Sequence, residues 1–300
     1  MNEVDLHTHT TASDGTLTPT ELVARAARLA IRVVAITDHD STEGVAEALE
    51  AGAAYNVEVI PGVEINTDVP GSEVHMLGYF VDHTHAGLTA QLARIREGRI
   101  GRARRMAEML AQMGAPVRFE RILELAGEGA VGRPHVARAL LEAGYVTSYQ
   151  EAFEKFIGRN SPAYVSRMKF TPAEACALIR QAGGVPVLAH PVSYDEHGAI
   201  KTPFDLSEEL PGLIAAGLMG IEVYYRGYDA VTIEYLMNVA RRYELLVTGG
   251  TDFHGPRPGE PELGGVYVPT KVVRVLRAAW ERMRLNPSAA SPGGSSTSGG

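Results

Sequence analysis

The sequence contains one cysteine and no long apolar run, and each scarcity excludes a class of protein. Cys176 is the lone cysteine, so an internal disulfide is excluded, and its apolar neighbours in a predicted helix indicate a core position rather than a nucleophile. No apolar stretch is long enough to span a membrane, and the chain does not open with a basic segment followed by an apolar run. We therefore expect a cytoplasmic protein without a membrane partner.

An excess of positive charge is also missing. The formal net charge is −8, which argues against a protein that coats long nucleic acids. Six arginines lie between Arg94 and Arg105, and Arg133 and Arg138 follow them. Most of the first six spread around a predicted helix, which is typical of a solvated face. A basic cluster of this size suits a short anionic substrate.

Length and composition favour one barrel-sized domain with an insertion. About 285 residues precede a tail, and 45% of the chain is apolar, enough for a sizeable core. The tail, residues 286–300, is rich in serine, glycine, proline and alanine. Such a segment cannot bury enough apolar area to order itself, so we expect it to be disordered.

Strands and helices alternate along most of the chain. Short apolar segments at 33–37, 57–60, 185–189 and 245–248 predict buried strands. Two apolar-alternating runs within 62–80 flank a Val-Pro-Gly-Ser turn and predict a hairpin.

Helices are predicted to begin at Thr18 and Thr171, because a proline and a reciprocal glutamate follow each threonine. From about residue 99 to residue 165 helical patterns dominate and no strand is predicted. The sequence thus predicts an α/β fold with barrel parts at 1–98 and 166–285 and a helical cap at 99–165.

Side chains that commonly bind metals occur at or just after the ends of these strands. In an extended chain, residues i and i+2 point to the same side, so His7 can act with His9, and Asp252 with His254. The hairpin places Glu64 and His75 on neighbouring strands. A mixture of imidazole and carboxylate suits Mn, Fe or Zn better than Mg or Ca. The candidate ligands are His7, His9, Asp14, His39, Glu64, His75, His190, Asp252 and His254.

Each of these residues alone has an ordinary structural explanation. An isolated His-x-His pair is a weak signal, His75 fits a half-buried strand position, and His190 before Pro191 fits the end of a strand. The joint arrangement is more specific, because the C-terminal edge of a barrel of alternating strands and helices carries the active site. We therefore predict a polynuclear metal site at that edge.

With all nine positions in order, the chain resembles the PHP (polymerase and histidinol phosphatase) family of metal-dependent phosphoesterases. The resemblance implies a distorted seven-stranded (β/α)7 barrel and two or three divalent ions, with Mn the first expectation and Fe or Zn the alternatives. It also implies three ligand groups: His7, His9, Glu64 and Asp252; Glu64, His75 and His190; and Asp14, His39 and His254.

The segment from Gly132 to Ala137 resembles the branch that includes nucleoside 3′,5′-bisphosphate phosphatases and the short-RNA exonuclease RNase AM. Pro134 fits the first turn of a helix, which places Arg133 and His135 at an N-terminus where backbone N–H groups favour phosphate. An arginine adds a bidentate charged donor. The alternative is that Arg133 only pairs with an acidic neighbour.

The predicted reaction is hydrolysis of a nucleotide phosphate ester by a metal-activated hydroxide, most specifically of the 3′-phosphate of nucleoside 3′,5′-bisphosphates. Short 5′-phosphorylated RNA, degraded 5′ to 3′, is a further predicted substrate. Asp14, His39, Arg133 and His135 are the predicted catalytic residues. Arg133, His135, Glu222 and Arg257 are the predicted substrate contacts.

Two alternatives stay open at this point. One is a phosphatase for a non-nucleotide metabolite such as histidinol phosphate, which the ligand set alone does not exclude. The other is a non-catalytic binding module in which metals only brace the fold. The proton donor to the leaving alcohol also stays open between His135, His197 and a water on the metal.

Overall fold

The computed structural model describes residues 2–70, 72–127, 131–166, 170–194, 198–256 and 261–285. The chain forms two compact units: the first consists of Met1–Thr89 and Phe170–Gly300, and the second is Ala90–Lys169. Arg257, His197 and the tail predicted at 286–300 lie outside the described residues.

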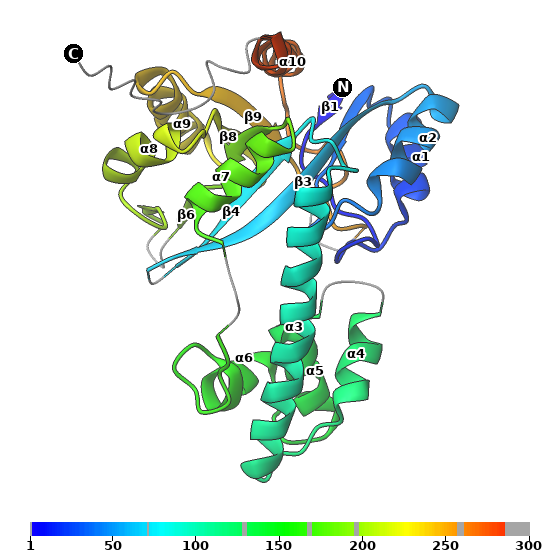
Figure 1. The fold of residues 1–300 in the computed structure, drawn as a ribbon, viewed down its shortest axis with the longest axis vertical. Helices are drawn as coiled ribbons and strands as arrows, with labels where there is room; N and C mark the ends of the chain where they lie inside the picture. The colour runs from blue at the N-terminus through cyan, green and yellow to red at the C-terminus, as the bar shows by residue number, and fades with distance from the viewer. Residues whose placement is uncertain are drawn as a thin grey trace, which may run out of the picture. The chain divides into compact units, whose positions relative to one another are not determined.

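The first unit is built on a seven-stranded sheet in the order β1-β2-β3-β4-β5-β8-β9, which curls into a nearly closed barrel (Figure 1). Pairing is parallel from β1 to β3, antiparallel from β3 through β4 to β5, and parallel from β5 through β8 to β9. The strands are β1 (Val4–Asp5), β2 (Val33–Ile36), β3 (Glu58–Val69), β4 (Ser72–Tyr79), β5 (Val185–Leu188), β8 (Gly220–Tyr225) and β9 (Leu246–Gly250). A separate ribbon pairs β6 (Ser193–Tyr194) with β7 (Ile200–Lys201).

The first and last strands of the sheet approach each other and nearly close the barrel. The Leu6 N–H donates to the Gly249 carbonyl at 3.2 Å, and Thr8 forms a parallel bridge with Phe253. A Cβ added at Gly250 would lie 2.4 Å from the backbone nitrogen of His7, so only glycine permits this approach. The predicted α/β barrel fold is confirmed.

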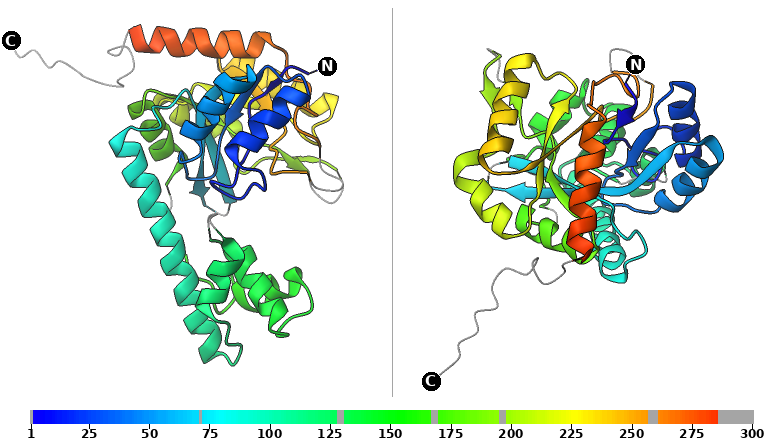
Figure 2. Two further views of the ribbon diagram at one scale, coloured as in Figure 1. Left: turned by 90° about the vertical axis from the view of Figure 1, so that its right-hand side faces the viewer. Right: turned by 90° about the horizontal axis from the view of Figure 1, so that it is seen from above.

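Helices cover the outside and one end of the barrel (Figure 2). Capping boxes at Thr18 and Thr171 start α1 and α7, as predicted. Val272 and Leu276 of the last helix pack on apolar residues that include Val4, near the start of the first strand. The helices of this unit are α1 (Pro19–Arg28), α2 (Val45–Tyr55), the first residues of α3 (Ala86–Gln112), α7 (Pro172–Gln181), α8 (Leu206–Ala215), α9 (Ala230–Arg242) and α10 (Lys271–Leu285).

The hairpin predicted within 62–80 is the β3–β4 pair. Its turn joins Val69 to Ser72, and Glu64 pairs with Leu77 while Asn66 pairs with His75. Glu64 and His75 therefore lie on adjacent strands, as the turn residues indicated.

The second unit is helical. It contains most of α3, then α4 (Phe119–Ala126), α5 (Arg133–Glu142), α6 (Tyr149–Ala152) and a π-helical turn η1 (Phe153–Ile157). Its own core includes Met106, Leu110, Ile122, Leu140 and Ile157, all buried. The helical patterns found at 99–165 fall in this unit. None of the described helices in either unit is long and apolar enough to cross a membrane.

Candidate metal centre

All nine predicted ligands lie in the first unit, and most follow the C-terminal end of a parallel strand. Glu64 and His75 instead lie within the hairpin strands β3 and β4, and Asp14 lies in the loop before α1. Parallel strands present their C-terminal ends at one edge of a barrel, which brings residues distant in sequence together. The remaining ligands follow β1 (His7, His9), β2 (His39), β5 (His190) and β9 (Asp252, His254).

The first group consists of His7, His9, Glu64 and Asp252, and all four residues are buried. Nε2 of His9 lies 3.2 Å from Glu64 Oε2 and 3.0 Å from Asp252 Oδ1. Nε2 of His7 lies 3.3 and 3.4 Å from the same two oxygens. Two imidazoles and two carboxylates thus converge on one point.

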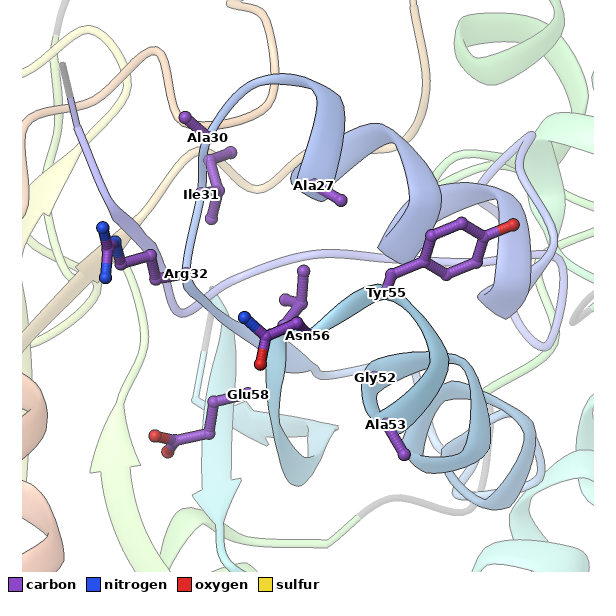
Figure 3. A pocket seen from close by; sticks show the side chains of 10 residues that line it. Ala27, Ala30, Ile31, Arg32, Gly52, Ala53, Tyr55, Asn56 and Glu58 are labelled. Carbon is purple, nitrogen blue, oxygen red and sulfur yellow. The ribbon is translucent and has the colours of Figure 1, made fainter.

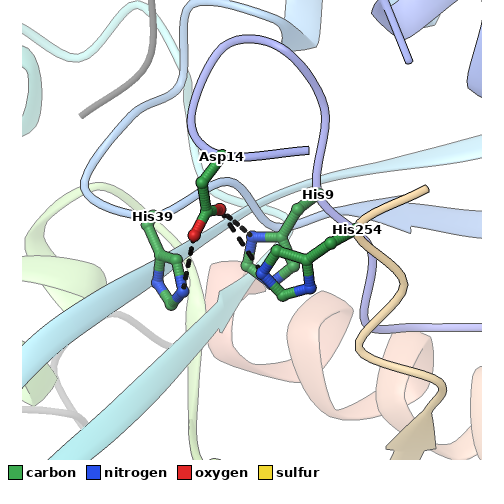
Figure 4. Close-up of side chains that lie close together, drawn as sticks. All are labelled: His9, Asp14, His39 and His254. Carbon is green, nitrogen blue, oxygen red and sulfur yellow. Dashed lines mark ion pairs between the residues drawn. The ribbon is translucent and has the colours of Figure 1, made fainter. Parts of the chain in front are cut away.

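The second group consists of His9, Asp14, His39 and His254 (Figure 4). Asp14 lies between the three rings: its Oδ1 is 3.4 Å from His254 Nε2 and 3.8 Å from His9 Nδ1, and its Oδ2 is 4.0 Å from His39 Nε2. His9 contributes one ring nitrogen to this group and the other to the first group. It therefore joins the two.

The third group consists of His39, Glu64 and His75. Nδ1 of His39 lies 3.0 Å from Glu64 Oε2, and Nδ1 of His75 lies 2.9 Å from Glu64 Oε1. His190 reaches the same Oε1 with its Nε2, at 3.0 Å. Glu64 is the carboxylate common to the first and third groups.

These groups resemble the division that the family resemblance implied, with three differences. His190 was expected to complete the group of Glu64 and His75, but it lies outside the three groups and reaches Glu64 Oε1 at 3.0 Å. His9 lies with Asp14, His39 and His254 as well as in its expected group, and His39 lies with Glu64 and His75 as well as with Asp14. Which residue binds which ion stays a prediction.

Buried polar atoms without partners show that the residues fit a divalent cation. Among the described residues, none forms a hydrogen bond with Nε2 of His7, with either ring nitrogen of His9, or with Oε2 of Glu64. A buried polar atom left unpaired costs about 1–3 kcal/mol. The two Nε2 atoms lie 3.3 and 3.2 Å from Glu64 Oε2 without hydrogen-bond geometry, and one cation between these three atoms would satisfy all of them. The Nδ1 atom of His9 faces Asp14 instead, at 3.8 Å, where a second cation would satisfy it.

The charges of the centre control its protonation. Burial opposes protonation of His9 and His75, but nearby carboxylates outweigh burial and raise the pKa of His9 to about 10 and that of His75 to about 9. Burial lowers the pKa of His39 to about 4. Burial would raise the pKa of Glu64, but the surrounding imidazoles hold it well below its usual value. A cation that binds here must displace the protons of His9 and His75.

Glu222 lies behind the ligands and has no exposed surface. Its Oε1 is 3.0 Å from His7 Nδ1, and its Oε2 accepts a hydrogen bond from the His190 backbone N–H at 2.8 Å. A carboxylate on Nδ1 fixes the tautomer that leaves Nε2 free to bind metal. This placement indicates a positioning role, and the substrate contact stays a prediction.

Two further buried aspartates hold the loops that carry the ligands. Asp38 accepts hydrogen bonds from the Thr10 N–H, the Thr10 hydroxyl and the Ser13 hydroxyl at 2.6–2.7 Å, and so fixes the loop before Asp14. Asp5 accepts hydrogen bonds from the Thr251 N–H and hydroxyl, next to Asp252.

The backbone is strained at two ligands. His190 has a φ of 23° and Asp252 a φ of 53°, in the region that residues with a side chain rarely occupy. Such strain costs of order 1–3 kcal/mol and persists only where surrounding contacts enforce it. The hydrogen bonds that the His190 backbone N–H donates to Glu222 and the Tyr225 hydroxyl donates to Asp252 are such contacts.

Tyr225 and Arg226 are site residues that the sequence reasoning missed. The Tyr225 hydroxyl donates to Asp252 Oδ2 at 2.8 Å, and an Arg226 nitrogen lies 3.2 Å from the same oxygen. The Arg226 side chain is 30% exposed, so this cation borders both the buried ligands and solvent. Both residues end β8 or directly follow it, and the rule that found the ligands at strand ends would also have found them.

Arg133 and His135 lie in the second unit, in the first turn of α5. The Arg133 guanidinium carbon is 5.3 Å from the Phe153 ring centre and 5.9 Å from that of Tyr164. No acidic residue within the described ranges pairs with Arg133, so the alternative of a simple ion pair has no support there. Nδ1 of His135 accepts a hydrogen bond from the Gly132 N–H at 3.0 Å.

Another pocket of the first unit lies away from the ligands, where α1 and α2 end (Figure 3). It measures about 660 Å³, and its lining includes Tyr55 and Asn56 at the end of α2 and Arg32 and Glu58 at the starts of β2 and β3. Because the ligands follow the other ends of these strands, this pocket is remote from the metal chemistry.

Comparison with known proteins gives the family. Residues 5–158 match the model of the PHP domain. The chain belongs to the PHP family. A 3′,5′-nucleoside bisphosphate phosphatase of Chromobacterium violaceum is 35% identical over 289 residues, covering 96% of this chain and 100% of that protein. The 5′-3′ exoribonuclease Rnm of Escherichia coli is 36% identical over 295 residues, covering 93% and 94%.

A solved structure from Bifidobacterium adolescentis, described as a metal-dependent phosphoesterase, has a TM-score of 0.77 at 34% identity and covers 92% of this chain and 96% of its own. The PHP protein described here is thus a hydrolase of the metal-dependent phosphoesterase type, as predicted. Its clustered histidines and carboxylates support binding of divalent metal.

Proposed function

We propose that this PHP protein hydrolyses the 3′-phosphate of nucleoside 3′,5′-bisphosphates and removes nucleotides from short 5′-phosphorylated RNA. The observation that carries the proposal is the set of three overlapping donor groups, joined through His9, His39 and Glu64. Two relatives that match along nearly their whole length are named for these two substrate classes. In both reactions water would add across the bond between phosphorus and the 3′ oxygen, leaving a nucleoside 5′-phosphate.

The metal ligands proposed are the nine clustered residues, and manganese is the ion that we expect, with iron or zinc as alternatives. Bound divalent ions supply hydroxide near neutral pH and neutralise charge on the phosphoryl oxygens. The protein's contribution is to hold the donors: Glu222 orients His7, Tyr225 orients Asp252, and Asp38 fixes the loop of Asp14.

Arg226 is the side chain that we propose to contact the phosphoryl group at the centre. Its guanidinium lies beside Asp252 and is part-exposed, so it can bind a substrate oxygen while it keeps that contact. The planar fork of arginine matches two phosphate oxygens, which a lysine cannot do.

In the second unit, Arg133 and His135 are proposed to bind the 5′-phosphate. The rings of Phe153 and Tyr164 flank the Arg133 guanidinium and restrict its orientation. Because Nδ1 of His135 accepts the Gly132 N–H, the neutral ring carries its proton on Nε2, where it is a donor. The first turn of α5 adds backbone N–H groups.

The test is phosphate release from adenosine 3′,5′-bisphosphate and from histidinol phosphate by protein reconstituted with manganese. We expect faster release from the bisphosphate. Arg133→Ala should raise KM for the bisphosphate about tenfold or more, the loss of one charge-assisted phosphate contact, without affecting histidinol phosphate.

Arg138→Ala is the matched control. Arg138 lies on the same helix and pairs with Glu142 at 3.4 Å, so its loss should leave KM unchanged. Faster turnover of histidinol phosphate would instead favour a metabolite phosphatase. No turnover of either compound by a metal-loaded protein would favour a binding module.

A further inference from the structure

A pocket of about 690 Å³ lies beside the metal centre, wholly within the first unit. Three stretches of chain and one strand end form its wall. The lining residues used below are Ser72, His190, Val192, Ser193, Lys201, Thr202 and Tyr225.

Two residues of the pocket wall touch the metal centre itself. His190 Nε2 lies 3.0 Å from Glu64 Oε1, and the Tyr225 hydroxyl donates to Asp252 at 2.8 Å. Glu64 and Asp252 both belong to the first, buried ligand group. A substrate whose phosphoryl group is held at the centre can therefore extend into this pocket.

The volume of the pocket exceeds what a terminal phosphate requires. In a bisphosphate the scissile phosphorus carries one ester group and otherwise only free oxygens, so nothing extends beyond it. In RNA the same phosphorus carries a second ester group, the next nucleotide. The pocket's volume lies within the range of about 300–1,000 Å³ typical of small-molecule sites, so it has room for such a group.

The chemistry of the pocket suits a nucleotide. Lys201 supplies a cation, and no residue in the described part of the chain forms an ion pair with it. The one carboxylate among the described lining residues, Glu73, lies 3.9 Å from Nε2 of His75. The hydroxyls of Ser72 and Thr202 can bond to ribose, and Val192 adds apolar surface. The Ser193 hydroxyl instead donates to the Lys201 carbonyl at 3.4 Å.

A row of aromatic rings continues from the pocket wall. The Tyr225 and Tyr228 ring centres are 5.2 Å apart, those of Tyr228 and Tyr194 are 6.5 Å apart, and Tyr194 is 38% exposed. The Tyr228 hydroxyl donates to the Val192 carbonyl and accepts from the Val192 N–H, which fixes this side of the pocket. Aromatic side chains stack on RNA bases without regard to sequence.

We propose that this pocket binds the nucleotide on the 3′ side of the scissile phosphate when the substrate is RNA, and that Lys201 contacts the phosphate after it. The inference rests on the proposed function and adds a binding site for the RNA that remains after the 5′ nucleotide is removed. In this step water adds across the bond between phosphorus and the 3′ oxygen: the water oxygen joins phosphorus, that bond breaks, and the 3′ oxygen of the released nucleotide takes the proton. The new 5′-phosphate stays on the RNA in the pocket.

The test compares adenosine 3′,5′-bisphosphate with 5′-phosphorylated triadenylate as substrates. Ser193→Trp fills the pocket from an exposed position, with Ser193→Ala as its control. Lys201→Ala removes the cation, with Lys271→Ala on α10 as its control. We expect each pocket variant to lower kcat/KM for the RNA about tenfold or more. Lys201→Ala loses one charged contact with the substrate, and Ser193→Trp blocks the pocket sterically. Turnover of the bisphosphate should change less than about twofold, and the controls should match the wild type.

Equal losses on both substrates, or no loss on the RNA, would overturn the pocket assignment. A wild-type protein that hydrolyses the bisphosphate but not the RNA would overturn it too, while the proposed phosphatase stands. If the wild type hydrolyses neither, the proposed function is wrong, and calorimetric binding of a phosphorothioate triadenylate decides the pocket alone. Weaker binding by Ser193→Trp would support the assignment, and equal binding would overturn it.

Discussion

Replacing Glu222 with glutamine tests whether a buried residue outside the ligand set controls metal binding. The carboxylate accepts a hydrogen bond at each oxygen, from His7 Nδ1 at 3.0 Å and from the His190 backbone N–H at 2.8 Å. It is fully buried, so water cannot replace either bond. Glutamine has nearly the same shape but offers one acceptor and one donor group.

Neither orientation of the amide preserves both bonds. If the amide oxygen accepts from His190, the amide NH₂ faces Nδ1 of His7, which must then become an acceptor and move its proton to Nε2. Nε2 is the nitrogen that faces Glu64 and Asp252, so the ring loses its metal-binding atom. If the amide is reversed, two donors meet at His190, in a segment whose backbone is already strained.

The expected loss in metal affinity is about 10- to 100-fold, the range found when a carboxylate behind a metal-binding histidine is removed. This corresponds to about 1.4–2.7 kcal/mol at one site. The measurement is manganese affinity by competition with a calibrated chelator, together with kcat at saturating manganese. Because the ligands themselves are intact, high manganese should restore a large part of kcat.

Glu281→Gln is the matched control, since Glu281 is exposed on α10 and its substitution removes the same charge. Its manganese affinity should equal that of the wild type. A Glu222→Gln protein that folds normally and binds manganese within about twofold of the wild type would refute the reasoning, because His7 would then not depend on its carboxylate for the correct tautomer.

The sequence allowed the ligands to be predicted because they obey a rule that is local in sequence. His39 and His190 each follow an apolar run, and a buried strand delivers such a residue to the barrel edge. The pairing of His7 with His9 could be predicted from their spacing alone, because alternate residues of an extended segment point to the same side. This held although β1 itself is only two residues long.

The supporting contacts could not be predicted in the same way because they join residues distant in sequence. Asp38 adjoins the ligand His39 in sequence, but it does not hold that histidine. In an extended segment neighbouring side chains point to opposite sides, and Asp38 instead bonds to Thr10 and Ser13, which the parallel pairing of β1 with β2 brings near.

The pocket beside the metal centre could not be predicted from the sequence for another reason. Two of its lining residues, Ser193 and Lys201, belong to the ribbon of β6 and β7, and each of these strands is two residues long. A period-2 pattern needs about four residues or more to be recognised. Arg226 follows β8 directly but was not predicted, because Glu222 was taken as the substrate contact from this strand.

Three further predictions test the support of the centre, its contact with substrate and its charge. Asp38→Asn should lower the free energy of unfolding, measured by urea titration in EDTA, by about 1–3 kcal/mol. The buried carboxylate accepts three hydrogen bonds, and asparagine replaces one of its two acceptor oxygens with an NH₂ donor. An unchanged unfolding midpoint would contradict this. Arg226→Lys should keep manganese affinity but lower kcat/KM about tenfold or more, since lysine keeps the charge and loses the fork; full activity would show that Arg226 does not bind the phosphoryl group. The pKa values of His9 and His75 are raised to about 10 and about 9, so their protonated forms stabilise the metal-free fold most fully below the unfolded value near 6.5, and this stabilisation is lost as pH rises toward the raised values. The Tm measured in EDTA should therefore fall between pH 6 and pH 9. Manganese binds the neutral rings, so the increase in Tm that manganese produces should grow over the same range. If the curves of Tm against pH with EDTA and with manganese are parallel, these histidines do not exchange protons for metal.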